Sequence, residues 1–236
     1  MKNTVVCKIC NVENPFYNFT CKNCKGFLRD KISNINFWFV ISKLFESPVT
    51  AFKTILYSEH KNFMFLLSFL IAIKMTLQSI FISIFVLGKP GSDFNNIIIY
   101  STVLIFLTPL ILYFFSWLLR RLLAIFNLES RVKDNYSIIV YSLVGYVFSL
   151  IVLFPIELIL FGKSLFQSSP SPFFLKPFSA YLMVAFESLF FLWSLFLTNR
   201  AIFTQSNKIL FSFILSLIIH MTLYALPIII WIPLHN

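Results

Sequence analysis

All four cysteines of this 236-residue chain lie close to its amino terminus, in two Cys-x-x-Cys pairs. Cys7 and Cys10 form the first pair, and Cys21 and Cys24 form the second after ten intervening residues. Each pair can present two thiolates to one metal ion, and four thiolates complete a closed tetrahedral zinc site with no position for a substrate. The spacing therefore predicts one structural Zn²⁺ rather than a catalytic metal.

Residues 1–30 would form a head that is too short to fold around a hydrophobic core alone. Metal ligation would supply most of its folding free energy. We expect a short β-hairpin carrying Phe16, Tyr17 and Phe19 to cover the metal, as in small zinc ribbons. Two disulfides are the first alternative, although a reducing cytoplasm disfavours them. A redox-active Cys-x-x-Cys is the second, but the βαβ context that such a motif requires is missing.

A second group of chemically capable residues lies inside long apolar stretches. Lys74, Glu187 and His220 each fall about ten to twelve residues into a separate stretch, and Gln78 follows Lys74 by one helical turn. An ionisable group at mid-membrane costs at least a few kcal/mol and is a functional hypothesis by default. We therefore predict a buried pair of Lys74 and Glu187 with His220 nearby. The pair could tie helices together, carry a proton or bind a small polar ligand, and Lys74 could instead face a water-filled crevice.

The apolar stretches that must position these residues are long enough to cross a membrane. Each has about 20 residues or more, the length that an α-helix needs to span the hydrocarbon layer. With 58% hydrophobic and 12% charged residues, the composition suits a membrane protein. The stretches cover residues 64–87, 97–119, 136–161, 178–198 and 209–232. The sequence predicts an all-α fold, a polytopic membrane bundle of five transmembrane helices over residues 63–236, preceded by the small zinc ribbon.

The third stretch carries further polar and small residues. Glu157 lies near its outer end, two residues after Pro155, and we expect this carboxylate at the interface in contact with water. Ser142, Gly145 and Ser149 form a small-residue face at three- and four-residue spacing. Such a face lets helices approach closely, either between two copies of a chain or within one chain. A homo-oligomer is therefore one prediction, and packing inside a single bundle is its alternative.

Residues 31–62, between the head and the bundle, are apolar but too interrupted by charges to span a membrane. Apolar positions recur at helical spacing on both sides of the turn at residues 46–48, which contains Pro48. We predict two short amphipathic helices in the cytoplasmic interface, with Trp38 and Tyr57 at the level of the lipid headgroups. Helices that cap the bundle from below are a compatible interpretation. The two apolar stripes comprise Phe37, Trp38, Val40, Ile41, Leu44 and Phe45, then Val49, Phe52, Ile55 and Leu56.

The cations of the chain are distributed unevenly between its polar segments. If there are five spans, fifteen Lys and Arg residues precede the first span or follow the second and fourth, and three lie on the opposite side. By the positive-inside rule, this bias places the amino terminus in the cytoplasm and the carboxyl terminus outside or in a lumen. The same rule accounts for the net charge of +10 without nucleic acid as a partner. We expect an integral, multi-pass protein of a bacterial inner membrane, and no apolar core of a signal peptide precedes Cys7.

The run from Phe45 to Phe52 resembles the opening of the Yip family of membrane proteins, which carry an acidic-x-Pro-x-x-Thr-Phe-like turn before the first span. The loop at 120–135 leading into 136–155, and the segment 193–208, are similar to later parts of that family. The resemblance covers residues 35–234. It implies five spans, a cytoplasmic amino terminus and, for eukaryotic members, roles in vesicle traffic and binding of small Rab-type GTPases. Versions with a zinc-ribbon head resemble prokaryotic members, whose task is generally unassigned.

Three functional classes follow from these features. A membrane organiser or adaptor of the Yip-like type would recruit a cytoplasmic protein or anionic lipid through the zinc ribbon and the basic rim. A small transporter or channel would instead use the midplane cluster of Lys74, Gln78, Glu187 and His220. No catalytic motif of an intramembrane enzyme is present, so we do not expect an enzyme. The adaptor is the function that we predict, and the transporter or channel is its alternative.

Overall fold

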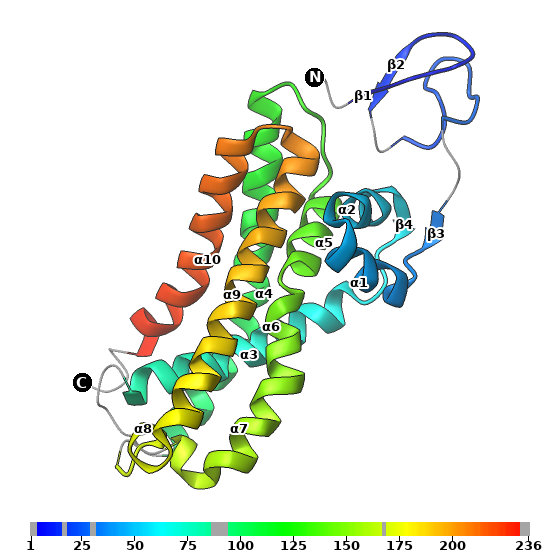
Figure 1. Ribbon diagram of the computed structural model, residues 1–236. Helices are drawn as coiled ribbons and strands as arrows, with labels where there is room; N and C mark the ends of the chain where they lie inside the picture. The colour runs from blue at the N-terminus through cyan, green and yellow to red at the C-terminus, as the bar shows by residue number, and fades with distance from the viewer. Residues whose placement is uncertain (1–3, 16–17, 29–31, 86–93, 167–168, 232–236) are drawn as a thin grey trace. The chain divides into compact units, whose positions relative to one another are not determined.

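The structure is a computed structural model that describes residues 4–15, 18–28, 32–85, 94–166 and 169–231 (Figure 1). Helices account for most of it, and strands are short and confined to residues before Lys61 in the described part. The described chain forms two compact units. Unit 1 comprises 1–65, 112–141 and 197–216, and unit 2 comprises 66–111, 142–196 and 217–236. Phe16 and Tyr17 of the predicted hairpin lie outside the described residues, and so does Lys89, one of the three cations predicted on the side opposite the amino terminus.

Long apolar helices confirm the predicted helical membrane bundle. Among the described residues, four segments are long and apolar enough to cross a membrane: 64–82, 98–125, 144–166 and 177–206. A fifth helix has a shorter apolar part, 209–225, so the fifth span remains a prediction. Many large apolar side chains of these helices are exposed, as expected of lipid-facing surfaces. The helices are α3 (Met64–Phe85), α4 (Phe94–Ile125), α9 (Pro177–Ser206) and α10 (Ile209–Trp231), with the third segment in several pieces.

The third predicted stretch is not one continuous α-helix. Pro155 has no N–H to donate to the carbonyl of Ile151, and the N–H of Phe154 donates to the carbonyl of Ser149, five residues back. The chain therefore forms a π-type turn over Ser149–Leu153, and single turns of this kind inside α-helices are frequent at functional sites. The pieces are α5 (Val132–Ser142), α6 (Val144–Phe148), the π segment (Ser149–Leu153), α7 (Phe154–Phe161), the 3₁₀ turn Gly162–Phe166 and α8 (Pro172–Leu175).

The small residues of the third stretch are used inside the chain. Gly145 of α6 is so close to α9 that an added Cβ would lie 2.8 Å from the carbonyl oxygen of Phe190 and also meet Ser194. Ser142 and Ser149 are fully buried as well. Because this face packs against a helix of the same chain, it gives no surface to a second copy. The predicted homo-oligomer therefore has to rest on other residues.

Two short helices precede the bundle, as the sequence predicts. Helix α1 (Phe37–Glu46) starts at Asn36, whose side chain accepts a hydrogen bond from the N–H of Phe39 at 3.2 Å, and α2 (Pro48–Tyr57) begins at Pro48. The two helices pack together through buried residues of each apolar stripe, including Leu44 and Phe52. Trp38 stays 77% exposed, so part of the stripe of α1 is left uncovered within unit 1. Strand β4 (Ser58–His60) then pairs in parallel with β3 (Ile32–Asn34).

A buried ion pair fixes the end of α2 within unit 1. The ammonium group of Lys61 lies 3.1 Å from a carboxylate oxygen of Asp134 and also donates to the carbonyls of Ile55 and Leu56, the latter at 3.0 Å. Arg131 binds the other oxygen of Asp134 at 2.8 Å. Burial lowers the pKa of Lys61 to about 8, and the nearby carboxylate of Asp134 opposes this shift only in part.

This pKa predicts how stability depends on pH. Because the folded chain holds the Lys61 proton less tightly than an unfolded chain with an ordinary pKa of 10.5, the cost of burying the charge is fully present below pH 8. Between pH 8 and pH 10.5 that cost disappears, which corresponds to about 3 kcal/mol over the whole interval. We expect the melting temperature in detergent to rise with pH in this interval relative to a Lys61→Met variant. Parallel melting curves of the two proteins across this range would contradict the assignment.

Candidate functional site

The two cysteine pairs form two turns of the same design. In the first, the N–H of Asn11 donates to the carbonyl of Cys7, and in the second the N–H of Lys25 donates to the carbonyl of Cys21. Asn11 and Lys25 each follow the second cysteine of their pair and both have positive φ, 53° and 61°. Strands β1 (Thr4–Val6) and β2 (Glu13–Pro15) pair on either side of the first turn. The chain thus forms the same turn twice, and each turn presents two thiols.

The four thiols converge on one point. Their sulfur atoms all lie within 4.8 Å of one another, and Cys7 and Cys24, like Cys10 and Cys21, are 3.5 Å apart. This separation exceeds the roughly 2.05 Å of a disulfide bond, and all four cysteines are free. Each close contact joins one turn to the other, so both turns are needed to complete the cluster. Four converging thiols are the donor set of a closed tetrahedral metal site.

Local hydrogen bonds prepare these thiols to bind a cation. The N–H of Cys24 and the side-chain amide of Asn14 help to lower the pKa of Cys21 to about 6, while burial opposes them. Backbone N–H groups of Cys10 and Ile9 likewise lower the pKa of Cys7. At Cys24 the N–H of Gly26 acts in the same direction, but burial and the three other thiols raise the pKa to about 12. A metal ion would remove this mutual repulsion by holding all four as thiolates.

Asn14 is a supporting residue that the sequence did not single out. Its buried amide donates to the sulfur of Cys21 at 3.4 Å and to the carbonyl of Val12 at 2.8 Å, and its oxygen accepts from the N–H of Lys22. One side chain therefore links β2 to both turns. Residues of this kind orient metal ligands from outside the coordination shell. An asparagine between two cysteine pairs has no spacing rule that would reveal this role.

The second candidate site lies entirely in unit 2 and contains the predicted intramembrane pair. The ammonium group of Lys74 in α3 lies 2.6 Å from an oxygen of Glu187 in α9, and Lys74 is almost completely buried. The hydroxyl of Ser149, in the π segment, donates to the same oxygen at 2.6 Å. Three helical segments therefore meet at one carboxylate. The pair is formed as expected, and Ser149 is an additional partner.

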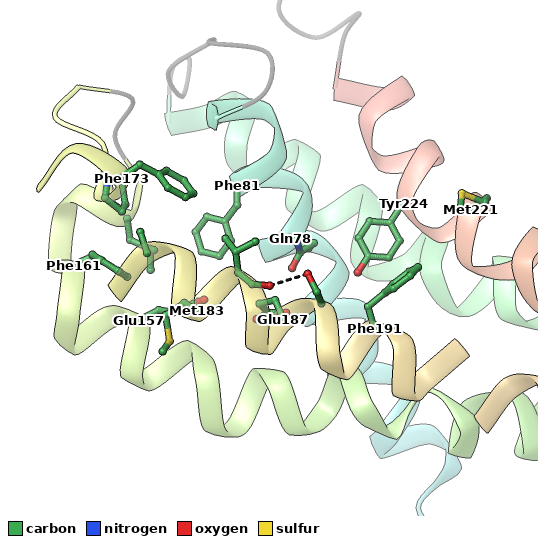
Figure 2. A pocket seen from close by; sticks show the side chains of 15 residues that line it. Gln78, Phe81, Glu157, Phe161, Phe173, Met183, Glu187, Phe191, Met221 and Tyr224 are labelled. Atoms are coloured by element: carbon green, nitrogen blue, oxygen red, sulfur yellow. Dashed lines mark hydrogen bonds between the residues drawn. The ribbon is translucent and has the colours of Figure 1, made fainter. Parts of the chain in front are cut away.

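A cavity of about 400 Å³ lies beside this carboxylate (Figure 2). Gln78 and Glu187 line it together with Glu157 from the first turn of α7. The expectation that Glu157 contacts interfacial water is wrong, because its side chain is only 7% exposed and faces this cavity. Distance from the end of a span does not indicate exposure when neighbouring helices cover the position. The other polar side chains at the cavity are Ser188 and Tyr224.

His220 of α10 is fully buried in the same unit, against aromatic rings. Its ring centre lies 5.8 Å from that of Tyr146 and 5.6 Å from that of Phe191. Phe191 lines the cavity, whereas His220 and Lys74 are not among its lining residues. The four predicted residues are thus divided, since Gln78 and Glu187 reach the cavity and the other two support its walls.

Comparison with known proteins gives no relative. No family model, no curated protein and no solved structure matches the chain. The resemblance of residues 35–234 to the Yip family therefore stays a prediction.

Proposed function

We propose that this helical membrane protein is an adaptor, whose head binds one structural Zn²⁺ and recruits a cytoplasmic protein partner. The convergence of Cys7, Cys10, Cys21 and Cys24 supports zinc, because four thiols leave no open position for catalysis. A head of this size that is tied to a membrane bundle can act by binding, since it has no room for a substrate cavity. A Yip-like arrangement, with its amino terminus in the cytoplasm of a bacterium, fits the same role.

The observation that carries this proposal is the apolar surface of the head. Ile9 and Phe27 are 71% and 72% exposed, and each lies on or beside one of the cysteine turns. The neighbouring Lys8, Lys22 and Lys25 are exposed as well. Exposed apolar side chains within a basic rim are typical of a protein-binding surface, because burying them against a partner is favourable. An acidic partner surface with an apolar centre would match this head.

The two short helices offer a second contact, with the bilayer. Trp38 and Phe45 of α1 are exposed, although Val40, Ile41 and Leu44 of the same stripe are buried. A helix that keeps aromatic side chains exposed next to membrane-spanning segments fits a position in the interface, with Trp38 among the headgroups. Lys43 and Lys53 would then lie near anionic lipids. In this arrangement, contact of α1 with the bilayer would keep the head on the cytoplasmic side of the membrane.

The test is crosslinking followed by affinity purification from native membranes. We would compare the full chain, a chain lacking residues 1–30 and an Ile9→Ser, Phe27→Ser variant that keeps all four cysteines. If the head recruits a partner, both altered proteins lose it, while the double substitution retains about one zinc per chain. A partner that copurifies equally with all three proteins would place recruitment elsewhere and contradict the adaptor role.

The cavity in unit 2 favours a second candidate function, a small transporter or channel. Its volume and its few polar side chains, Gln78, Glu157 and Glu187, are typical of small-molecule sites. Proteoliposomes would decide between the two functions. A transporter keeps its flux when residues 1–30 are removed and loses it when Gln78 is replaced by Leu, whereas an adaptor shows no flux in either form.

A further inference from the structure

The cavity in unit 2 combines a carboxylate that is already paired with one that is not. Glu187 is held by Lys74 and Ser149, so its charge is compensated inside the protein. Glu157 is more than nine-tenths buried, and among the described residues its Oε2 atom has no hydrogen-bond partner. A buried polar group without a partner costs free energy that a suitable ligand can recover. The cavity therefore contains one group that a bound molecule could satisfy.

The sign of the charge that would suit Glu157 follows from the other side chains around it. No Lys, Arg or His is among the described residues that line the cavity. Of the polar lining residues, Ser188 already donates its hydroxyl to the carbonyl of Val184 at 2.8 Å. Because Lys74 compensates Glu187, the charge that a ligand meets is that of Glu157, which would repel an anion and pair with a cation. Electrostatics thus favour a positively charged ligand.

The rest of the lining is aromatic and apolar, which indicates the body of the ligand. The rings at the cavity come from α3, α7, α8, α9 and α10, and two methionines complete the wall (Figure 2). Aromatic faces attract organic cations, and they do so more strongly where water is excluded. Methionine adapts its shape to irregular apolar groups. These side chains are Phe81, Phe161, Phe173, Phe191 and Tyr224, with Met183 and Met221.

We propose that this cavity binds a monovalent organic cation with an apolar body, and that Glu157 supplies the carboxylate that pairs with its charge. A volume of about 400 Å³ is in the range of small-molecule sites. A free organic cation fits better than the ammonium head of a zwitterionic lipid, because the lipid phosphate would bring a negative charge near that of Glu157. This inference goes beyond the adaptor role. The proposal concerns binding of the cation and does not require that the protein transports it.

Binding can be measured with an organic cation and with its uncharged analogue of the same shape. Benzyltrimethylammonium is the probe, and neopentylbenzene has the same shape with carbon in place of the charged nitrogen. The full chain is placed in nanodiscs of phosphatidylglycerol, with empty nanodiscs as the blank for partitioning into lipid. We expect the protein to bind benzyltrimethylammonium at least tenfold more tightly than neopentylbenzene. Equal binding of the two probes would show that Glu157 carries no charge toward the ligand and would overturn the proposal.

Substitutions then assign the charge to a residue. Glu157→Gln is expected to weaken binding of the cation at least tenfold and leave binding of neopentylbenzene unchanged. Glu157→Asp should retain part of the preference, and Glu59→Gln, outside the cavity, should retain all of it. Wild-type affinity in a folded Glu157→Gln protein would overturn the proposal. If that variant does not fold, the comparison of the two probes on the wild-type chain and on the Asp variant decides.

A lipid source of the ammonium group is tested by competition. Dihexanoyl-phosphatidylcholine is added to the wild-type nanodiscs with bound benzyltrimethylammonium. If the cavity takes free organic cations, the short lipid displaces the probe only at concentrations far above those of unlabelled benzyltrimethylammonium. Displacement at equal concentrations would assign the cavity to lipid headgroups and overturn the proposal. Flux through proteoliposomes is measured separately, so a failure of the transport function leaves the binding result intact.

Discussion

Replacing Cys21 with Ser is expected to release zinc from the purified protein and unfold the head, while the helical bundle keeps its circular dichroism. Structural zinc contributes about 10–16 kcal/mol to the folding of small zinc-binding peptides, far more than a head of this size can obtain from its core. Cys21 is buried, and its sulfur accepts a hydrogen bond from Asn14. Zinc content by mass spectrometry and limited proteolysis of residues 1–30 measure the two effects.

A matched control is available in the same turn. Lys22 follows Cys21 directly and is exposed, so Lys22→Ser introduces the same residue type without removing a ligand. That variant should keep about one zinc per chain and its resistance to protease. Removing zinc from the wild-type protein with a chelator should reproduce the effect of Cys21→Ser. A Cys21→Ser protein with unchanged zinc content would mean that the metal is bound elsewhere.

The second large effect is expected at Glu187. Substitution by Gln keeps the shape of the side chain but leaves the ammonium group of Lys74, which is almost completely buried, without its counter-charge. Breaking a buried pair from one side costs about 3–5 kcal/mol. We therefore expect a clear fall in the melting temperature of the protein in detergent, and loss of the helical signal at lower temperature.

Two further variants distinguish the effect of the ion pair on stability from the effect of changing a neighbouring side chain. Ser188→Ala changes the next residue of α9, which is exposed, and should melt like the wild type. A Lys74→Met, Glu187→Leu double variant removes both charges and should recover most of the stability, because apolar residues often replace buried pairs without loss. An unchanged melting temperature of Glu187→Gln would show that the two side chains do not depend on each other in the membrane.

The features that could be predicted from the sequence are those that stand out against their surroundings. The cysteine pairs that begin at Cys7 and end at Cys24 are informative because two identical Cys-x-x-Cys spacings have few explanations. Lys74 and Glu187 are informative because charged residues are rare in apolar stretches. Helix boundaries near Pro48 and Pro177 were also accessible, since proline fixes the first turn of a helix. Each of these signals is local, so a single sequence contains it.

Other features depend on which elements meet in space. Lys61 lies among many cations whose distribution explains membrane topology, so nothing in its neighbourhood indicates that it is buried against Asp134, far along the chain. The burial of Glu157 and the close approach of Gly145 to Phe190 likewise depend on the packing of α9. Periodicity describes which face of a helix is apolar. It does not say which helix covers that face.

The π turn at Ser149–Leu153 also sets the angular phase of the helix that carries it. It accommodates one residue more than an α-helical turn. Compared with a regular α-helix of the same length, the residues after the turn are therefore rotated by about 100° about the helix axis. Gly145 can therefore point at α9 while Glu157, twelve positions later, points into the cavity. A regular α-helix of the same length would turn Glu157 away from this direction by about 100°, whereas a regular helix with one residue fewer would keep it. The π turn thus lets the chain hold an extra residue between Gly145 and Glu157 without changing where Glu157 points.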